Sequence, residues 1–176
     1  YFDPTGAAGD HAIISGGIRK FVDSLALPCD PSVSVCTGTS TLGQFLPVAV
    51  PDKNTYPGSD YYEIAVVQYR EQMHSDLPPT LLRGYVQLET IANANISQHY
   101  QLTNANLNGP ATTIAGFFGV TPPHYLGATI VATKDRPVRI KFYNLLPTGV
   151  AGNLFIPVDT TVMGSGMGPD LYGMVE

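Results

Sequence analysis

Two cysteines are the first residues of this chain whose spacing could do chemistry. Cys29 and Cys36 are its only cysteines, and the six residues between them include Pro31. A disulfide closing so short a loop would stabilise the fold by about 2–3 kcal/mol in the chain-entropy model. The alternatives are two free thiols or a metal site, but a four-ligand zinc site needs a second pair of Cys or His nearby. The spacing favours a disulfide, and with it an oxidising compartment.

Histidines are the other candidate metal ligands. The sequence has four of them, none within two residues of another and none in a His-x-His or His-x-x-x-His pattern: His11, His74, His99 and His124. A transition-metal site would require the fold to gather them. We interpret each as a surface or hydrogen-bond-capped histidine, with a structural role for His74 in a turn, and we predict that this chain alone has no catalytic residue and binds no metal tightly.

Weaker patterns lie near the end of the chain. Gly164-Ser165-Gly166 is not a Gly-x-Ser-x-Gly nucleophile elbow, and with Gly168 it lacks the spacing of a dinucleotide-binding fingerprint. Met163 and Met167 are four residues apart and could mimic soft copper ligation. Methionine also fills gaps in packed surfaces, and that interpretation is favoured.

One modification sequence and the start of the chain bear on its compartment. Asn95-Ile96-Ser97 is a glycosylation sequon, so Asn95 is a candidate acceptor, although such short matches often arise by chance. The sequence begins at Tyr1 and shows no apolar signal segment, which fits a mature chain whose targeting peptide is gone or a trimmed chain. With the cysteine pair, this predicts an extracytoplasmic protein: secreted, periplasmic or on the cell surface.

Composition indicates which elements must position these residues. The 176 residues suit one domain, and 13% are charged, far below the roughly 25% of average domains. Eighteen Gly, 15 Pro and ten Tyr favour a β-rich, turn-rich fold and exclude a helical bundle or coiled coil. A net charge of -5 with nine Lys and Arg argues against a nucleic-acid partner. The sequence contains no run of 18 apolar residues, so it predicts no membrane span.

Residues 1–60 are predicted to form an irregular arm laid over a larger body. Gly, Pro, Ser, Thr and Asp dominate from Thr37 to Asp60, which is typical of segments without packed elements. A short helix is predicted over Gly17–Leu27, because its apolar residues recur at helical spacing and Pro28 would end it.

Residues 61–176 are predicted to form the body. Apolar, β-branched and aromatic enrichment or alternation predicts strands at Tyr61–Met73, Ala128–Thr133 and Val138–Asn144, and a turn over Lys134–Pro137 joins the last two. Leu81–Leu88 is predicted to continue as extended chain. The low-charge stretch over Glu89–Val120 is predicted to be a long surface excursion containing a hairpin.

Three ordered blocks resemble the opening of bacterial multicopper oxidases of the spore-coat laccase type. The first runs from Tyr61 through Met73-His74-Ser75-Asp76-Leu77-Pro78-Pro79-Thr80 to Gly84-Tyr85. The second joins Tyr125-Leu126-Gly127-Ala128-Thr129-Ile130 to a segment over 136–147 that ends in Asn-Leu-Leu-Pro. The third is Phe155-Ile156-Pro157-Val158-Asp159. Ala128 stands where the family usually has Pro, and residues 89–123 look like an insertion.

The resemblance implies an all-β, cupredoxin-like Greek-key sandwich that is incomplete, because its early strands alone would leave open edges. The family's first copper ligands lie in a His-x-His-Gly motif downstream of the matched blocks, and no such motif occurs up to Glu176. The implied complete enzyme oxidises phenols or metal ions one electron at a time and reduces oxygen to water. This segment would be scaffold, and its partner would be the copper-bearing remainder of the oxidase.

A second function remains open from the residues alone. High Tyr, Asn, Thr and Gly content with low charge also fits a non-enzymatic secreted β-sandwich that acts as a binding or surface-assembly module. What the gene encodes after Glu176 separates the two hypotheses.

Overall fold

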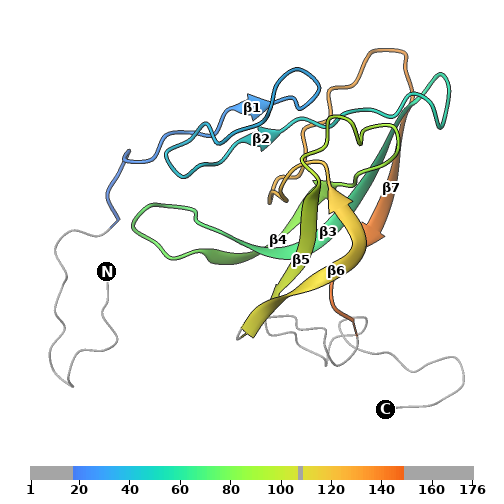
Figure 1. The fold of residues 1–176 in the computed structure, drawn as a ribbon. Coiled ribbons are helices and arrows are strands. Elements are labelled where there is room, and N and C mark those ends of the chain that lie inside the picture. Colours follow the sequence, from blue (N-terminus) through green and yellow to red (C-terminus); the bar gives the residue numbers. More distant parts are fainter. Residues whose placement is uncertain (1–17, 107–108, 149–176) are drawn as a thin grey trace, which may run out of the picture. The chain divides into compact units, whose positions relative to one another are not determined.

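The computed structural model describes residues 18–106 and 109–148, and within these ranges all regular structure is β (Figure 1). The strands are β1 (Pro28–Cys29), β2 (Leu46–Pro47), β3 (Asp60–Glu71), β4 (Thr80–Gln87), β5 (Tyr100–Asn106), β6 (Gly109–Gly119) and β7 (Val138–Asn144). The all-β class predicted from composition is confirmed. The chain divides into two compact units, Tyr1–Leu146 and Pro147–Glu176, and nearly all of the second lies outside the described residues. The predicted boundary at residue 60 stays a prediction.

A three-stranded sheet forms the centre of the first unit. β3 lies between β4, to which it is antiparallel, and β7, to which it is parallel. The long run of β-branched and aromatic residues in β3 suits this central place, since side chains on both of its faces are buried. Ala65 and Val67 point to one face, and Tyr62 and Ile64 point to the other.

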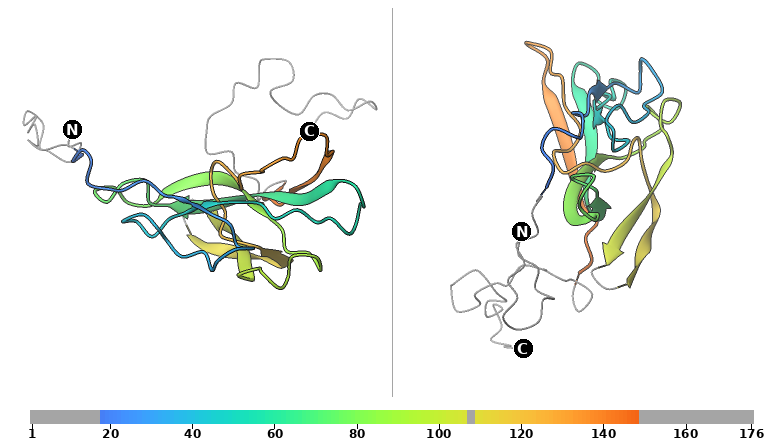
Figure 2. Two further views of the ribbon diagram at one scale, coloured as in Figure 1. Left: turned by 90° about the horizontal axis from the view of Figure 1, so that it is seen from above. Right: turned by 90° about the vertical axis from the view of Figure 1, so that its left-hand side faces the viewer.

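The β5–β6 hairpin covers the first face as a second layer, visible in the right-hand view of Figure 2. Leu102 of β5 packs against Ala65, Val67 and Val86 and is 0% exposed. The hairpin expected within Glu89–Val120 is confirmed. Most of this stretch is exposed or half-buried, as expected of a surface excursion, but Leu102 and Val120 are buried against the rest of the fold.

The arm covers part of the opposite face. Ala49 packs on Tyr62 and Ile64, and Ala128 and Ile130 border the same cluster. Apart from the two-residue strands β1 and β2, which pair in parallel, the described arm is irregular, as predicted.

Buried amide side chains fasten both coverings to the sheet. The Gln87 side chain accepts a hydrogen bond from Val50 N (2.9 Å) and donates one to Val50 O (2.6 Å), which ties the arm to β4. Gln68 Nε2 donates to Ala105 O (2.7 Å), and Asn104 Oδ1 accepts from Gln68 N (2.9 Å), which ties β5 to β3. Buried amides of this kind satisfy backbone groups where no strand pairing does.

The helix predicted over Gly17–Leu27 is absent from the described part, 18–27. Phe21 has a φ of 59° and is fully exposed, so the predicted apolar stripe has no surface to pack on. Side-chain hydroxyls of the same arm accept the backbone donors instead: Thr41 accepts from Ser24 N and Thr39 accepts from Leu27 N. Without burial, a stripe this short does not sustain a helix.

The strand predicted over Ala128–Thr133 is also wrong. Only Thr129 forms a bridge, to Val48 of the arm, through Thr129 N to Pro47 O (2.7 Å) and Ala49 N to Thr129 O (2.9 Å). The segment follows the irregular arm rather than a strand, so its pairing stops after one residue. The turn expected before Val138 and the strand Val138–Asn144 are confirmed.

Candidate functional site: disulfide loop and histidine pocket

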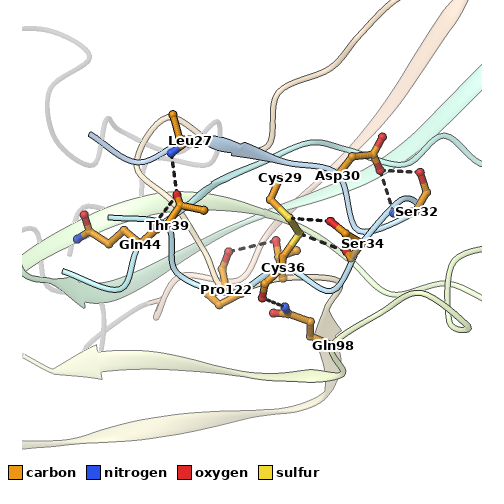
Figure 3. The surroundings of a disulfide bond; sticks show 11 residues. Leu27, Cys29, Asp30, Ser32, Ser34, Cys36, Thr39, Gln44, Gln98 and Pro122 are labelled. Carbon is orange, nitrogen blue, oxygen red and sulfur yellow. Dashed lines mark hydrogen bonds between the residues drawn. A yellow bond between two sulfur atoms is a disulfide. The ribbon is translucent and has the colours of Figure 1, made fainter. Parts of the chain in front are cut away.

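Cys29 and Cys36 form a disulfide, with sulfur atoms 2.09 Å apart and Cα atoms 5.7 Å apart (Figure 3). The loop between them turns on Asp30, whose Oδ1 accepts hydrogen bonds from the backbone N and the hydroxyl of Ser32 (2.8 and 2.6 Å). Val33 and Val35 project from this loop and are largely exposed. Because both sulfurs are bonded to each other, neither offers a thiolate to a metal.

The disulfide lies where the arm meets a second segment. Cys36 is buried, and its carbonyl accepts a hydrogen bond from Gln98 Nε2 (2.6 Å), just before β5. Figure 3 shows Gln98 reaching Cys36 in this way. Cys29 O accepts from Val48 N (2.8 Å) next to β2. The disulfide therefore locks a loop that contacts both the rest of the arm and the approach to the hairpin.

Among the histidines at described positions, His124 is the one that is buried, with 5% of its surface exposed. Its Nδ1 accepts a hydrogen bond from Leu126 N (3.2 Å), which places the ring proton on Nε2. Nε2 lies 3.9 Å from Glu71 Oε1. Burial lowers the pKa of His124, and the nearby Glu71 carboxylate opposes that shift only in part. The ring is therefore neutral at physiological pH.

A tyrosine completes this cluster. The Tyr69 hydroxyl donates to Glu71 Oε2 (2.6 Å), and burial together with that carboxylate raises the pKa of Tyr69. A cavity of about 100 Å³ adjoins Glu71 and His124 and is walled by Phe45, Pro47 and prolines 122 and 123. Such a volume admits a few water molecules but falls well below the 300–1,000 Å³ of typical ligand pockets. The cavity is therefore too small for an organic substrate.

His74 helps to clamp the arm to the β3–β4 turn. Its Nδ1 accepts from Asp76 N (3.0 Å), and its Nε2 donates to Arg19 O (2.8 Å). Arg19 also pairs with Asp76 at 2.5 Å, and this guanidinium holds the pKa of Asp76 down at about 2. Asp23 accepts from Ser75 N (2.8 Å) in the same contact. These contacts give His74 the structural role that the sequence predicts for it.

The other predicted site residues lie apart. His99 stacks on Phe118 at 3.9 Å between ring centroids, with Nδ1 3.1 Å from a Glu89 oxygen. Asn95 lies exposed, so its side chain is accessible for modification, and its glycosylation stays a prediction. His11, Gly164-Ser165-Gly166 and the methionines at 163 and 167 lie outside the described residues.

The described residues do not fit a copper site. Across 18–106 and 109–148, no three His, Cys, Asp or Glu side chains gather closely enough to hold a metal ion. His74, His99 and His124 are each engaged with different protein groups, and both sulfurs are in the disulfide.

Sequence reasoning missed the partners of these residues. Glu71, Asp23 and Gln98 each meet a predicted site residue from a distant part of the sequence. No local pattern marks them, because only the folded chain brings a strand end, an arm and a loop together.

The comparisons with known proteins give one relative. A laccase from Bacillus stratosphericus is 28% identical to this chain over 145 residues, which are 82% of this chain and 17% of the laccase. The chain thus spans less than a fifth of the length of the curated relative it matches. No protein-family model and no solved structure matches it. Within the described ranges, no helix is long and apolar enough to cross a membrane.

Proposed function

We propose that this chain is the opening, cupredoxin-like segment of a multicopper oxidase and serves there as scaffold. The whole enzyme would couple one-electron oxidation of phenols or metal ions to reduction of oxygen to water. The similarity to a laccase over 82% of the chain carries this proposal. It agrees with the resemblance of the blocks around 61–85 and 125–147 to the same family.

The positions of those blocks support a scaffold role. They contribute β3, the central strand of the sheet, and β7, the edge strand that pairs with it in parallel. The His74-Ser75-Asp76 part of the first block makes the turn that holds the arm. Residues that look like family signatures thus make structural contacts, which fits a segment that supports a site formed elsewhere.

In this proposal, copper is bound by the remainder of the oxidase, which is the partner of this segment. His74 and His124 accept hydrogen bonds from this chain's own backbone, which is consistent with copper being bound elsewhere. The enzyme would act outside the cytoplasm, and the disulfide supports this location because such bonds persist in oxidising compartments.

Copper binding and oxygen uptake test the proposal. The coding sequence beyond Glu176 is expected to contain a His-x-His-Gly motif within a few tens of residues. The longer polypeptide should retain copper after dialysis against a mild chelator and consume oxygen with a methoxyphenol, whereas residues 1–176 alone should do neither. A longer polypeptide without copper-dependent oxygen uptake would refute the oxidase, and stoichiometric copper on residues 1–176 would refute the scaffold role.

A secreted binding or surface-assembly module is the second candidate. One observation favours it: both faces of the central sheet already carry coverings within Tyr1–Leu146, fastened by buried amides and a disulfide. Expression of residues 1–176 alone decides this point. A monomer that melts cooperatively, with no copper-bearing companion in the gene, would favour the module over the oxidase segment.

A further inference from the structure

A cavity of about 400 Å³ lies where the loop after β4 meets the end of β6. Its walls include Glu63, Glu89, Thr90, Ile91, Phe117 and Phe118. This volume is within the range of ligand pockets and admits a molecule with one aromatic ring. The cavity is separate from the His124 cluster and from the disulfide loop, which have other linings.

The walls of this cavity combine aromatic surface with negative charge. Phe117 and Phe118 supply rings, and the fully exposed Ile91 side chain stands at the rim. Glu63 accepts hydrogen bonds from the hydroxyls of Tyr61 (2.7 Å) and Tyr143 (2.9 Å), which fix its carboxylate in place. Both carboxylates that line the cavity accept hydrogen bonds and donate none when ionised.

The charges around these carboxylates leave the cavity acidic. His99 lies 3.1 Å from a Glu89 carboxylate oxygen and stacks on Phe118. The Lys141 amine lies over the Tyr143 ring at 4.7 Å, and Tyr143 and Glu63 raise the pKa of that amine. Neither His99 nor Lys141 lines the cavity. The lining therefore contains two carboxyl side chains and no basic one.

Hydrogen bonds hold the loop wall of the cavity in a fixed shape. The buried Asn93 side chain accepts from Thr90 N (2.7 Å) and donates to Leu88 O (3.2 Å). The loop that carries Glu89 and Ile91 is therefore tied to the end of β4.

We propose that this cavity binds an organic ammonium ion with an aromatic body. The carboxylates attract its charge, and the phenylalanine rings add cation–π and apolar contact. A carboxylate of the same shape would be repelled. The proposal needs no copper and holds for either function proposed above.

Three probes of equal size test it by calorimetry on the full 176-residue chain: phenethylammonium, 2-phenylethanol and phenylacetate. Phenethylammonium should bind about tenfold more tightly than the alcohol, and phenylacetate should not bind measurably. Equal binding of the cation and the alcohol, or no binding of the cation, would overturn the proposal.

Two variants locate the site. Glu89→Gln should weaken phenethylammonium binding about tenfold and leave 2-phenylethanol unchanged. Ile91→Arg, at a fully exposed position that cannot disturb the core, should weaken binding of the cation by charge repulsion. Asp135→Asn, which removes an exposed carboxylate that does not line the cavity, is the matched charge control and should change nothing. Equal weakening by Asp135→Asn, or full binding in Ile91→Arg, would place the cation elsewhere and overturn the assignment.

Discussion

The two faces of the central sheet are covered in different ways. On the face under the β5–β6 hairpin, Ala65, Val67, Val86, Leu88 and Leu102 are each no more than 2% exposed. On the face under the arm, Ala49, Tyr62 and Ile64 are buried, but nearby large side chains are not: Tyr85 is 44%, Ile140 40% and Phe142 66% exposed.

The difference follows from the regularity of each covering. The hairpin strands present apolar side chains to the sheet, so Leu102 and the half-buried Ile114 and Phe117 pack against the core residues of β3 and β4. The irregular arm presents apolar groups only at points such as Ala49, and polar contacts and the disulfide hold it in place. An irregular covering can be firmly attached and still leave apolar surface open.

The largest expected effect separates the two faces directly. Leu102→Ala should reduce the free energy of unfolding by about 2–5 kcal/mol, because it leaves a cavity in the closed core. Phe142→Ala on the arm face should cost under about 1 kcal/mol, since that ring is already mostly solvated. Urea unfolding of both variants measures the contrast, and equal losses would show that the arm face is as closed as the hairpin face.

Removing the disulfide should have the next largest effect. Replacing both Cys29 and Cys36 by Ser should lower the free energy of unfolding by about 2–3 kcal/mol, through greater freedom of the unfolded loop. The same unfolding assay, run with and without reductant on the unmodified chain, is the control. Intact-mass analysis of fresh, unreduced protein should find no alkylatable thiol, and two modified thiols would contradict the pairing.

Removing the Gln87 amide that ties the arm to β4 should reduce the free energy of unfolding by a smaller amount. Gln87→Leu leaves Val50 N and Val50 O without their partner and should cost about 1–3 kcal/mol. Gln101→Leu, at an exposed position on β5, is the matched control and should cost less than about 1 kcal/mol. Faster hydrogen exchange at Val50 in Gln87→Leu alone would show that the amide holds the arm, and unchanged exchange there would remove that role.

The smallest expected effect is on pH dependence. Burial lowers the pKa of His124 below its usual value of about 6.5. At a pH between the folded pKa and about 6.5, the unfolded chain therefore binds a proton that the folded chain does not. Stability should therefore fall as pH drops below about 6.5 and level off below the folded pKa. His124→Asn keeps an acceptor for Leu126 N but does not titrate, and it should flatten this part of the stability profile. An identical slope in the variant would assign the dependence to other groups.

The sequence by itself determined the elements whose signals are local. Alternation in Val138–Asn144, β-branched and aromatic enrichment in β3 and a charged turn at 134–137 were sufficient to predict these two strands and the turn before β7. A short cysteine spacing was sufficient to predict the disulfide. Each of these depends on residues within about a dozen positions of one another, so chain geometry alone limits the outcome.

Tertiary structure decided which segments pack against each other and which distant residues become neighbours. The apolar spacing around Phe21 has a helical period, yet no surface faces it and no helix forms. Ala128–Thr133 has a strand-like composition, yet its neighbour is the irregular arm, so pairing stops at Thr129. Glu71 and His124, or Glu63 and Glu89, become neighbours only through strand register and loop placement. Propensity is a weak local bias of tenths of a kcal/mol per residue, whereas burial against a distant partner contributes several times more, so the partner decides the structure.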